Sequence, residues 1–511
     1  MFTPVAEKLL ELNDRTSLTR MAKVHSLGLT LTSLTFLAVT VPKVQAVSFT
    51  IDTNFTGTTF RSSDAGSTSI PPDTMGAVGK DHFVELINGR YSVYNKSDTT
   101  RVQTSTLNQF WSNAGVTPRG LSAFDPRVTF DPFSQRWYAT SVDNARQANN
   151  FLLAVSNSTD PTAGWKGFAI DSDSTNQRWA DYPTLGFDKD GVYLAANMFS
   201  ITTGASALPT LTTLIAASKA DLLSGTLTKT VFENQSSSRT GFTVQPVIDL
   251  DNSGLPASLL SAFNTSAGSF KQSSFTGSIA SPTLNTSGGF INVTPYKDPL
   301  LGAKQPGRAK PDLDTGDNRL SSNVILKNGV LWGVQTVAQD KRAALCWFKI
   351  NASTNTLFEE GLIADPDFDY SYGSLAVNAQ GNVVIGFSGL SNTKGQFAST
   401  YAAVGETAGG SAFGSTTFTV PVLLKAGVAG YFQDFGSGRN RWGDYSATTI
   451  DPEDAFSFWT IQEFVSAEDT WSTQITKINI RVPEPNAMPM PVVLLGGLGL
   501  GASLWRKWRS S

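Results

Sequence analysis

The sequence contains very little cysteine and histidine. Cys346 is the one cysteine among 511 residues, and His25 and His82 are the two histidines. A single cysteine excludes an intrachain disulfide and a zinc site built from cysteines alone. Two histidines argue against a histidine-rich metal centre and against a Ser-His-Asp triad. Acid–base chemistry would therefore fall mainly to carboxylates, tyrosine or lysine.

Charged residues are also scarce. They make up 16% of the chain, apolar residues make up 40%, and the formal net charge is −3. Soluble proteins usually have about 25% charged residues. This composition excludes a disordered acidic protein, a coiled coil and a basic nucleic-acid-binding protein.

The N-terminus has the pattern of a secretory signal peptide. A short basic start at residues 21–25 precedes a mostly apolar stretch, 26–41, and small residues at 44 and 46 suit a signal peptidase. The apolar stretch is too short for a spanning helix. We expect residues 1–46 to be an N-terminal extension and signal peptide, with Met21 as the true start. The alternative is a buried core helix.

The C-terminus carries three elements in a fixed order. A Pro-Glu-Pro motif is followed by the Gly-rich apolar run 492–505 and by a basic end at 506–509. The motif consists of Val482, Pro483, Glu484 and Pro485. Residues 482–511 resemble a PEP-CTERM sorting signal. The resemblance implies an exosortase-type enzyme as partner, transient residence of the apolar helix in the inner membrane, and cleavage near the motif. The alternative is an ordinary tail anchor.

Removal of both ends would leave an acidic body. Without the charges of residues 1–46 and 486–511, 31 Lys and Arg and 39 Asp and Glu remain, a balance of −8. Such a protein has no electrostatic reason to bind nucleic acid. We expect it to be exported to the cell envelope, the outer surface or the extracellular space.

Residues 47–481 read as repeated β-structure. An extended run, an Asp/Asn/Gly turn and a more apolar run recur seven times, with turns near 81, 131, 188, 251, 328, 378 and 451. Each gap leaves room for a second hairpin, and four strands every 50–75 residues is the spacing of a β-propeller blade. We predict an all-β, probable seven-bladed propeller, with six or eight blades as alternatives. The other folds left open are a large β-sandwich and a β-solenoid.

The body also resembles exported bacterial propeller proteins of unknown activity. The resemblance rests on the opening at residues 71–79 and on a Trp-small-Asp-Tyr unit. That unit is part of an Arg-Trp-small-Asp-Tyr sequence found twice, at 178–182 and 441–445. The resemblance implies the fold and export but no activity.

In a propeller the first strand of each blade lines the central channel, so residues that enter those strands should meet at one mouth. Asp, Arg and Tyr are frequent there, and they suit a sugar, a carboxylated ligand or calcium. They also suit clamps between blades. The candidate ligand-binding residues are Asp73, Asp125, Arg127, Arg178, Asp181, Tyr182, Tyr370, Arg441, Asp444 and Tyr445, with Gln245, Asn318, Arg319, Asp369 and Tyr372 at equivalent positions.

Acidic turns give a second set of candidates. Carboxylates at alternate positions can surround a hard cation, although none of these turns completes an EF-hand loop. Calcium is therefore a candidate cofactor, and plain solvated turns are the alternative. The residues are Asp188, Asp190, Asp249, Asp251, Asp312, Asp314 and Asp317.

No motif for a nucleophile or a phosphate-binding loop is present, so the sequence favours a protein without catalytic activity. The leading hypothesis is a surface or matrix protein that binds polysaccharide or another surface ligand. The second is a carbohydrate-active hydrolase or lyase that uses Asp, Tyr and Arg at the channel mouth. The third is a purely structural layer protein whose mouth residues clamp the blades.

Overall fold

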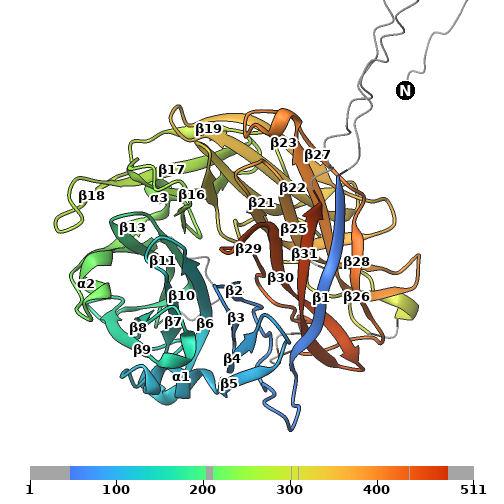
Figure 1. The fold of residues 1–511 in the computed structure, drawn as a ribbon, viewed down its shortest axis with the longest axis horizontal. Coiled ribbons are helices and arrows are strands. Elements are labelled where there is room, and N and C mark those ends of the chain that lie inside the picture. Colours follow the sequence, from blue (N-terminus) through green and yellow to red (C-terminus); the bar gives the residue numbers. More distant parts are fainter. Residues whose placement is uncertain are drawn as a thin grey trace, which may run out of the picture. The chain divides into compact units, whose positions relative to one another are not determined.

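Antiparallel β-strands dominate the regular secondary structure (Figure 1). The computed structural model describes residues 47–202, 211–300, 302–308, 310–434, 436 and 438–481. The predicted signal peptide and sorting signal lie outside these residues. In the described ranges, no helix has the length and apolar character that a membrane span requires.

Three of the sheets have four strands each. The first contains β2 (Gly76–Val78), β3 (His82–Ile87), β4 (Arg90–Asn95) and β5 (Arg101–Ser105). The second contains β6 (Ala123–Asp131), β7 (Arg136–Asp143), β8 (Asn150–Ser156) and β9 (Trp165–Asp171). The third joins β1 (Ser48–Thr59) to β29 (Ala447–Asp451), β30 (Asp454–Ala467) and β31 (Thr470–Arg481).

Two sheets have five strands. One contains β14 (Gln245–Pro246), β16 (Ala257–Asn264), β17 (Ser269–Thr276), β18 (Thr283–Asn285) and β19 (Phe290–Asn292). The other contains β24 (Asp369–Val377), β25 (Val383–Ser391), β26 (Gln396–Thr407), β27 (Thr416–Phe418) and β28 (Val422–Gly427).

The remaining sheet has nine strands and holds two successive meanders. The first is β10 (Arg178–Phe187), β11 (Gly191–Ser200), β12 (Leu211–Ser218) and β13 (Lys229–Ser236). The second is β20 (Ile325–Lys327), β21 (Val330–Gln339), β22 (Arg342–Asn351) and β23 (Thr356–Ile363). The short strand β15 (Ile248–Asp249) joins them by parallel pairing with β10 and β20.

The helices are short and lie between strands. They are α1 (Leu107–Asn113), α2 (Lys219–Leu223) and α3 (Ser237–Thr240), with 3₁₀ turns at Arg119–Leu121, Pro161–Ala163, Pro306–Arg308 and Ala408–Gly410. The Thr106 side chain caps α1 by accepting the Gln109 N–H.

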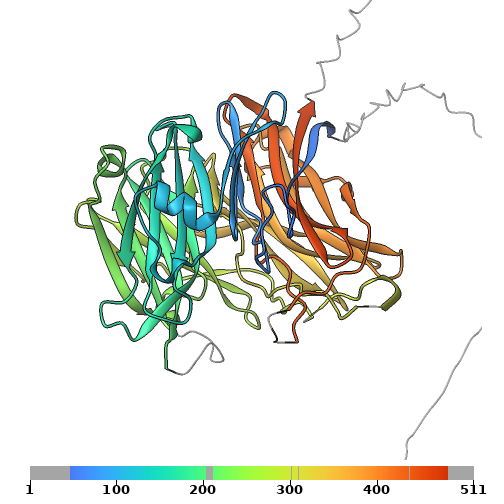
Figure 2. The same ribbon diagram turned by 90° about the horizontal axis from the view of Figure 1, so that it is seen from below.

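The first strands of successive meanders form a closed ring. β2 packs against β6, β6 against β10, β10 against β15, β15 against β20, β20 against β24, β24 against β29, and β29 against β2. Figure 1 shows β2, β10 and β29 near the centre, and Figure 2 shows the sheets standing side by side. This arrangement is a β-propeller, so the predicted fold class is confirmed, and the sandwich and solenoid alternatives are wrong.

The blade count differs from the prediction. Seven separate blades were expected, and the hydrogen bonds define six sheets of unequal size. The hairpin expected around the turn near 251 forms only in part: β14 pairs with β16 and the Val247 N–H donates to the Ser258 carbonyl, but β15 leaves to pair with β10 and β20. The sequence pattern predicts hairpins well, but it does not show that two meanders share one sheet.

The N-terminal strand of the body completes the last sheet. β1 pairs antiparallel with β31, with Ser48 opposite Arg481. The buried Glu85 of β3 joins this seam, because it accepts hydrogen bonds from the Thr58 backbone and hydroxyl, from Thr473 and from Tyr94. The first and last strands of the body are thereby joined by hydrogen bonds, and β1 covers the edge of β31 that would otherwise be unpaired.

The cores lie between neighbouring sheets. β25 is buried at every position, because each of its faces packs against another sheet. Trp111, Trp137, Trp332, Trp442, Trp459 and Trp471 are all nearly inaccessible to solvent. Cys346 of β22 is only partly buried, and burial raises the pKa of its thiol to about 12.

Candidate functional site

Charged and aromatic side chains gather where the inner strands of the ring begin. The parallel pairing of β10, β15 and β20 shows that these inner strands start at the same end. Residues at the starts of different meanders therefore meet. We call this set the charged cluster; its members are Asp73, Asp125, Arg127, Asp181, Tyr182, Arg319, Tyr372, Arg441, Asp444, Tyr445 and Glu463.

Three inner strands have a β-bulge at the same place. Phe124 of β6 lies opposite Val142 of β7, and the next paired residue of β6, Arg127, lies opposite Thr140. Two residues of β6 therefore stand between these pairs where β7 has one. β10 repeats the shift between Asp181 and Thr184, and β24 repeats it between Ser371 and Ser374. One extra residue on each inner strand redirects the side chains next to it.

A strained backbone accompanies each bulge. Asp125, Tyr182 and Tyr372 have φ values of 52°, 58° and 55°, and Asp73, just before β2, has 49°. The left-handed region costs such residues about 1–3 kcal/mol each. Side chains of neighbouring elements accept hydrogen bonds from these strained residues. The Asp125 N–H donates to the Asn88 side chain at 2.8 Å, and the Tyr372 N–H donates to the Thr336 hydroxyl at 3.1 Å.

Asp73 and Asp125 form the inner layer of the charged cluster. Asp73 is 1% exposed and accepts the Asp444 N–H at 2.7 Å and the Asn88 amide at 2.6 Å. Asp125 is 9% exposed and accepts the Tyr182 N–H at 3.2 Å. We call these two residues the inner carboxylates. Their hydrogen bonds connect different sheets, which is the clamping role that the sequence left open.

Arg127 lies at the centre of the inner layer. Its guanidinium donates to the Pro183 carbonyl at 3.0 Å and to the Ser321 carbonyl at 2.9 Å. It stacks 3.4 Å from the Tyr445 ring centre and 5.1 Å from that of Tyr182. Arg127 therefore ties β6 to β10 and to the segment before β20.

The two tyrosines of the repeated motif meet each other. The rings of Tyr182 and Tyr445 are edge to face, with their centres 5.7 Å apart. The Tyr182 hydroxyl donates to the Asp444 carbonyl, and the Tyr445 hydroxyl donates to the Pro126 carbonyl. Both rings are buried, so neither offers an exposed surface on which a sugar could stack.

Asp181 and Asp444 form an outer layer that reaches solvent. Asp181 is partly exposed, and the Asp444 side chain is 26% exposed. Arg441 binds Asp444 at 2.7 Å, and Arg319 makes two hydrogen bonds to Asp317, at 2.7 and 2.6 Å. We call Asp181 and Asp444 the outer carboxylates. They are the acids of the charged cluster that a ligand could reach.

Burial and the repulsion of neighbouring carboxylates raise the pKa values of Asp73, Asp125 and Asp181. The pKa of Asp73 lies well above its usual range because the group is buried and because Asp444 and Asp125 repel its negative charge. The pKa of Asp125 rises through burial and Asp444, and that of Asp181 rises well above normal through burial and Asp125. Arg127 and the neighbouring side chains of Asp73 and Asp181 partly offset the rise in the pKa of Asp125.

Eight of the ten candidate ligand-binding residues lie in the charged cluster; Tyr370 and Arg178 do not, and among the equivalent positions Gln245, Asn318 and Asp369 also lie outside it. Tyr370 packs in the core against Phe368, Phe387 and Tyr401, and Tyr372 occupies the cluster position instead. Residues two apart on a regular strand share a face, and the β-bulge between Ser371 and Ser374 redirects Tyr372 away from the face that Tyr370 occupies. Arg178 is partly exposed, and its backbone N–H binds Asp173, but no contact in the described chain joins its side chain to the cluster.

Sequence reasoning missed Asn88 and Glu463. Asn88 links Asp73 to Asp125, and Glu463 accepts the Gly443 N–H at 2.9 Å. Burial raises the pKa of Glu463 well above its usual range. Glu463 is a charged residue within the long, largely apolar strand β30, and this irregularity could have identified it as a candidate site residue. Asn88 lies in a turn, where nothing in the sequence distinguishes it.

The acidic turns use their carboxylates for local contacts. Asp249 accepts the N–H groups of Asp251 and Ser253, and Asp188 accepts those of Asp190 and Gly191. Asp251 accepts the N–H groups of residues 328 and 329. Three further carboxylates pair with a basic side chain: Asp190 with Lys189, Asp314 with Arg439 and Asp317 with Arg319. Asp312 is exposed. Nowhere in the described ranges do three His, Cys, Asp or Glu side chains have an arrangement suited to a metal ion.

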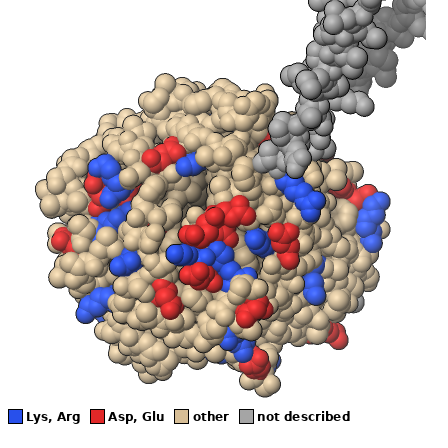
Figure 3. Space-filling model, in the orientation of Figure 1, with Lys and Arg blue, Asp and Glu red and all other residues tan. Residues whose placement is uncertain are grey.

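The face seen in Figure 3 is the opposite end of the sheets from the charged cluster, the end at which β31 finishes, and it carries both acidic and basic residues. Acidic and basic side chains lie beside one another near its centre, next to a hollow. His82 lies away from the charged cluster, with its ring 3.9 Å from Asp160. The carboxylates of the charged cluster can accept hydrogen bonds from hydroxyl groups, and its guanidiniums can donate to them.

The ring of sheets and its central cluster define the protein as a β-propeller with a polar site where the inner strands begin. No family model matches the chain, and no curated protein sequence matches it. Similar solved structures exist, all with low identity.

Three of these structures illustrate the range. The endo-arabinase from Bacteroides thetaiotaomicron is 11% identical, with a TM-score of 0.31 over 71% of this chain and 94% of that one. The Trypanosoma rangeli sialidase in complex with sialic acid is 11% identical, with a TM-score of 0.37 over 80% and 57%. The WD40 domain of SCAP from fission yeast is 6% identical, with a TM-score of 0.33 over 78% and 79%. Similarity this weak carries no information about activity.

Proposed function

We propose that this propeller is a surface binding protein that holds a polysaccharide at the charged cluster. The observation that carries the proposal is the division of the cluster into two layers. The inner carboxylates are buried and bound to backbone groups of other sheets, whereas Asp181 and Asp444 are accessible and lie beside guanidiniums. A preformed set of carboxylates and guanidiniums suits vicinal hydroxyl groups.

A binding role fits the pairing of the accessible charges. Arg441 is bonded to Asp444 and Arg319 to Asp317, so the exposed charges already balance each other. Such pairs retain free N–H groups and lone pairs for hydroxyls but give little attraction for a strongly charged ligand. The proposal therefore favours neutral over highly anionic polysaccharides.

A glycan array tests this proposal. The full chain should bind neutral oligosaccharides, and Asp181→Asn and Asp444→Asn should each weaken that binding at least about tenfold, because each removes a charged hydrogen-bond partner. Asp98→Asn, in the exposed turn between β4 and β5, is the matched control and should bind like the wild type. Binding that survives in both outer variants contradicts the proposal.

A carbohydrate-active hydrolase or lyase is the second candidate. It is favoured by the raised pKa of Asp181, because a partly exposed carboxyl with a pKa above its usual range is better suited to act as a general acid. Release of reducing ends or unsaturated ends from an oligosaccharide, lost in Asp181→Asn with unchanged binding, would identify this activity. Binding without turnover supports the binding protein.

We also propose that the protein is exported and sorted, as its two ends indicate. An exosortase-type enzyme would recognise Val482 to Pro485 while the apolar run 492–505 is held in the inner membrane. Mass spectrometry of the protein from the cell surface should find a C-terminus near Pro485 and an N-terminus near Val47. An intact C-terminal tail on the surface protein would contradict the sorting proposal.

A further inference from the structure

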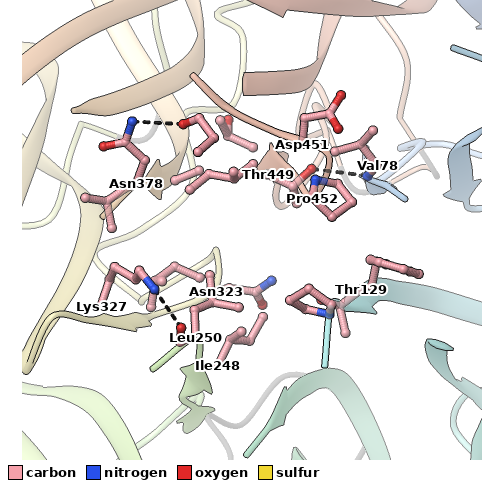
Figure 4. Close-up of a pocket in the computed structure, with 18 of the residues that line it drawn as sticks. Val78, Thr129, Ile248, Leu250, Asn323, Lys327, Asn378, Thr449, Asp451 and Pro452 are labelled. Carbon is pink, nitrogen blue, oxygen red and sulfur yellow. Dashed lines mark hydrogen bonds between the residues drawn. The ribbon is translucent and has the colours of Figure 1, made fainter. Parts of the chain in front are cut away.

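A cavity lies at the opposite end of the inner strands from the charged cluster. Its volume is about 290 Å³, and its walls come from the C-terminal parts of β2, β6, β15, β20, β24 and β29. Figure 4 shows Val78, Thr449 and Pro452 on one side of the open space and Ile248, Leu250 and Asn323 on the other. The cavity is therefore a second site, on the same ring of strands but independent of the charged cluster.

The cavity walls are mainly apolar. Val78, Phe130, Ile248, Ile325, Val377 and Ile450 line it. Phe133, at the turn between β6 and β7, also belongs to the lining and is 51% exposed. An exposed aromatic ring beside an apolar cavity gains stability when an apolar molecule covers it, because both surfaces then leave water.

The charges at the cavity are already neutralised. Lys327 donates to the Leu250 carbonyl at 2.8 Å and lies 3.4 Å from the Asp251 carboxylate. Asp451 binds Lys96 at 2.7 Å and accepts the Trp459 indole N–H at 3.1 Å. A charged ligand would lose its hydration without gaining a free counter-charge. The cavity therefore favours an uncharged molecule.

The side chain of Asn323 remains available to a ligand. Asn378 donates to the Ala455 carbonyl and accepts the N–H groups of residues 380 and 382, and Thr449 accepts the Val78 N–H. Asn323 has no hydrogen-bond partner in the part of the chain that the structure describes, and in Figure 4 its amide points into the space between the two walls. An amide can both donate to and accept from a single polar group of a ligand.

We propose that this cavity binds a compact, uncharged, mainly apolar molecule of about two to three rings, with one hydrogen-bonding group directed at Asn323. The size follows from the volume, since an apolar cavity of about 150 Å³ accommodates benzene and this cavity is about 290 Å³. The proposal does not depend on polysaccharide binding at the charged cluster.

Titration of the full chain with N-phenyl-1-naphthylamine tests the proposal. This uncharged probe has a naphthalene and a phenyl ring joined by an N–H group, and its fluorescence rises in apolar surroundings. We expect saturable binding at one site. Asn323→Val should weaken it about threefold to tenfold, because one hydrogen bond to the ligand is lost.

Two blocking variants locate the site. Ala379 and Ala455 are exposed residues at the rim of the cavity, so Ala379→Trp and Ala455→Trp can fill its entrance without disturbing the core. Each should weaken probe binding at least about tenfold. Ala267→Trp, in the exposed turn between β16 and β17, is the matched control and should bind like the wild type.

Several results would overturn the proposal. These are no saturable binding to the full chain, or equal binding by Ala267→Trp and both rim variants while all three keep the wild-type circular dichroism spectrum. Binding that appears only after residues 482–511 are removed would also contradict it, because the tail would then be the occupant. Loss of binding in the rim variants alone supports the proposal.

Discussion

The two copies of the Arg-Trp-small-Asp-Tyr sequence occupy different local structures but meet at one site. Residues 178–182 lie inside β10, whereas residues 441–445 lie in the connection that precedes β29. In both copies a backbone N–H is accepted by an inner carboxylate: Asp125 binds Tyr182, and Asp73 binds Asp444. The tyrosines then meet edge to face.

The arginines and tryptophans of the two copies differ. Arg441 bonds to Asp444, while the Arg178 side chain has no such contact within the described residues. The Trp442 indole donates to Ser388, while the buried Trp179 indole N–H has no acceptor in the described chain. The comparison teaches that Asp and Tyr have a common role in joining the ring, whereas the roles of Arg and Trp depend on the neighbouring sheet.

The largest expected effect is at the inner carboxylates. Asp73→Ala leaves the Asp444 N–H and the Asn88 amide without their acceptor in the interior, and should lower the free energy of unfolding by about 3–5 kcal/mol. Asp125→Ala removes one such backbone bond and should cost about 1–3 kcal/mol. Urea unfolding followed by circular dichroism measures both.

Asp73→Asn is the control for this pair. It keeps one carbonyl oxygen for the Asp444 N–H and should retain most of the stability lost in Asp73→Ala. If both variants unfold at the wild-type urea concentration, the clamp between the first and last sheets is not a source of stability.

Substitutions of the two tryptophans should differ by a smaller amount in their effect on the free energy of unfolding. Trp442→Phe loses the bond to Ser388, whereas Trp179→Phe removes a buried N–H that has no acceptor in the described structure. We therefore expect Trp442→Phe to cost about 1 kcal/mol more than Trp179→Phe in free energy of unfolding. Equal costs in urea unfolding would show that the two copies are energetically equivalent at this position.

The raised pKa values predict a pH dependence. A carboxyl whose pKa is higher in the folded than in the unfolded protein stabilises the fold at low pH, and this contribution is lost as pH rises above about 4 through the folded-state pKa. Asp125→Asn removes one of these acids, so the stability of this variant should fall less steeply with rising pH than that of the wild type. Its stability deficit relative to the wild type should therefore shrink as pH rises from about 4 to about 8.

Thermal unfolding of both proteins across this pH range measures the effect. A deficit that stays constant or grows with pH contradicts the assignment of raised pKa values to the inner layer.

The arginines should show the smallest effects. Arg441→Ala breaks a partly exposed pair with Asp444 and should cost about 1 kcal/mol or less. Arg178→Ala should change stability by less than about 0.5 kcal/mol, because its side chain is partly exposed and outside the cluster. Differential scanning calorimetry of the two variants tests the contrast, and a larger loss in Arg178→Ala would reverse it.

The sequence predicted the hairpins and the meeting of distant Asp-Tyr pairs, because both follow from turn residues and from repetition. It could not distinguish Tyr370 from Tyr372, since the bulge between Ser371 and Ser374 determines which ring enters the cluster. It could not reveal β15, whose parallel pairing fuses two meanders, or Asn88, whose role depends on contacts with Asp73 and Asp125. These features depend on tertiary contacts that no local pattern records.

The most direct test of the central claim is a paired measurement on Asp181→Asn and Asp444→Asn: binding to a glycan array and the unfolding temperature of the same preparations. The account predicts that both variants lose the neutral glycans bound by the wild type and unfold within a few degrees of it. Glycan binding retained by both variants would contradict the separation of the cluster into a structural layer and a binding layer.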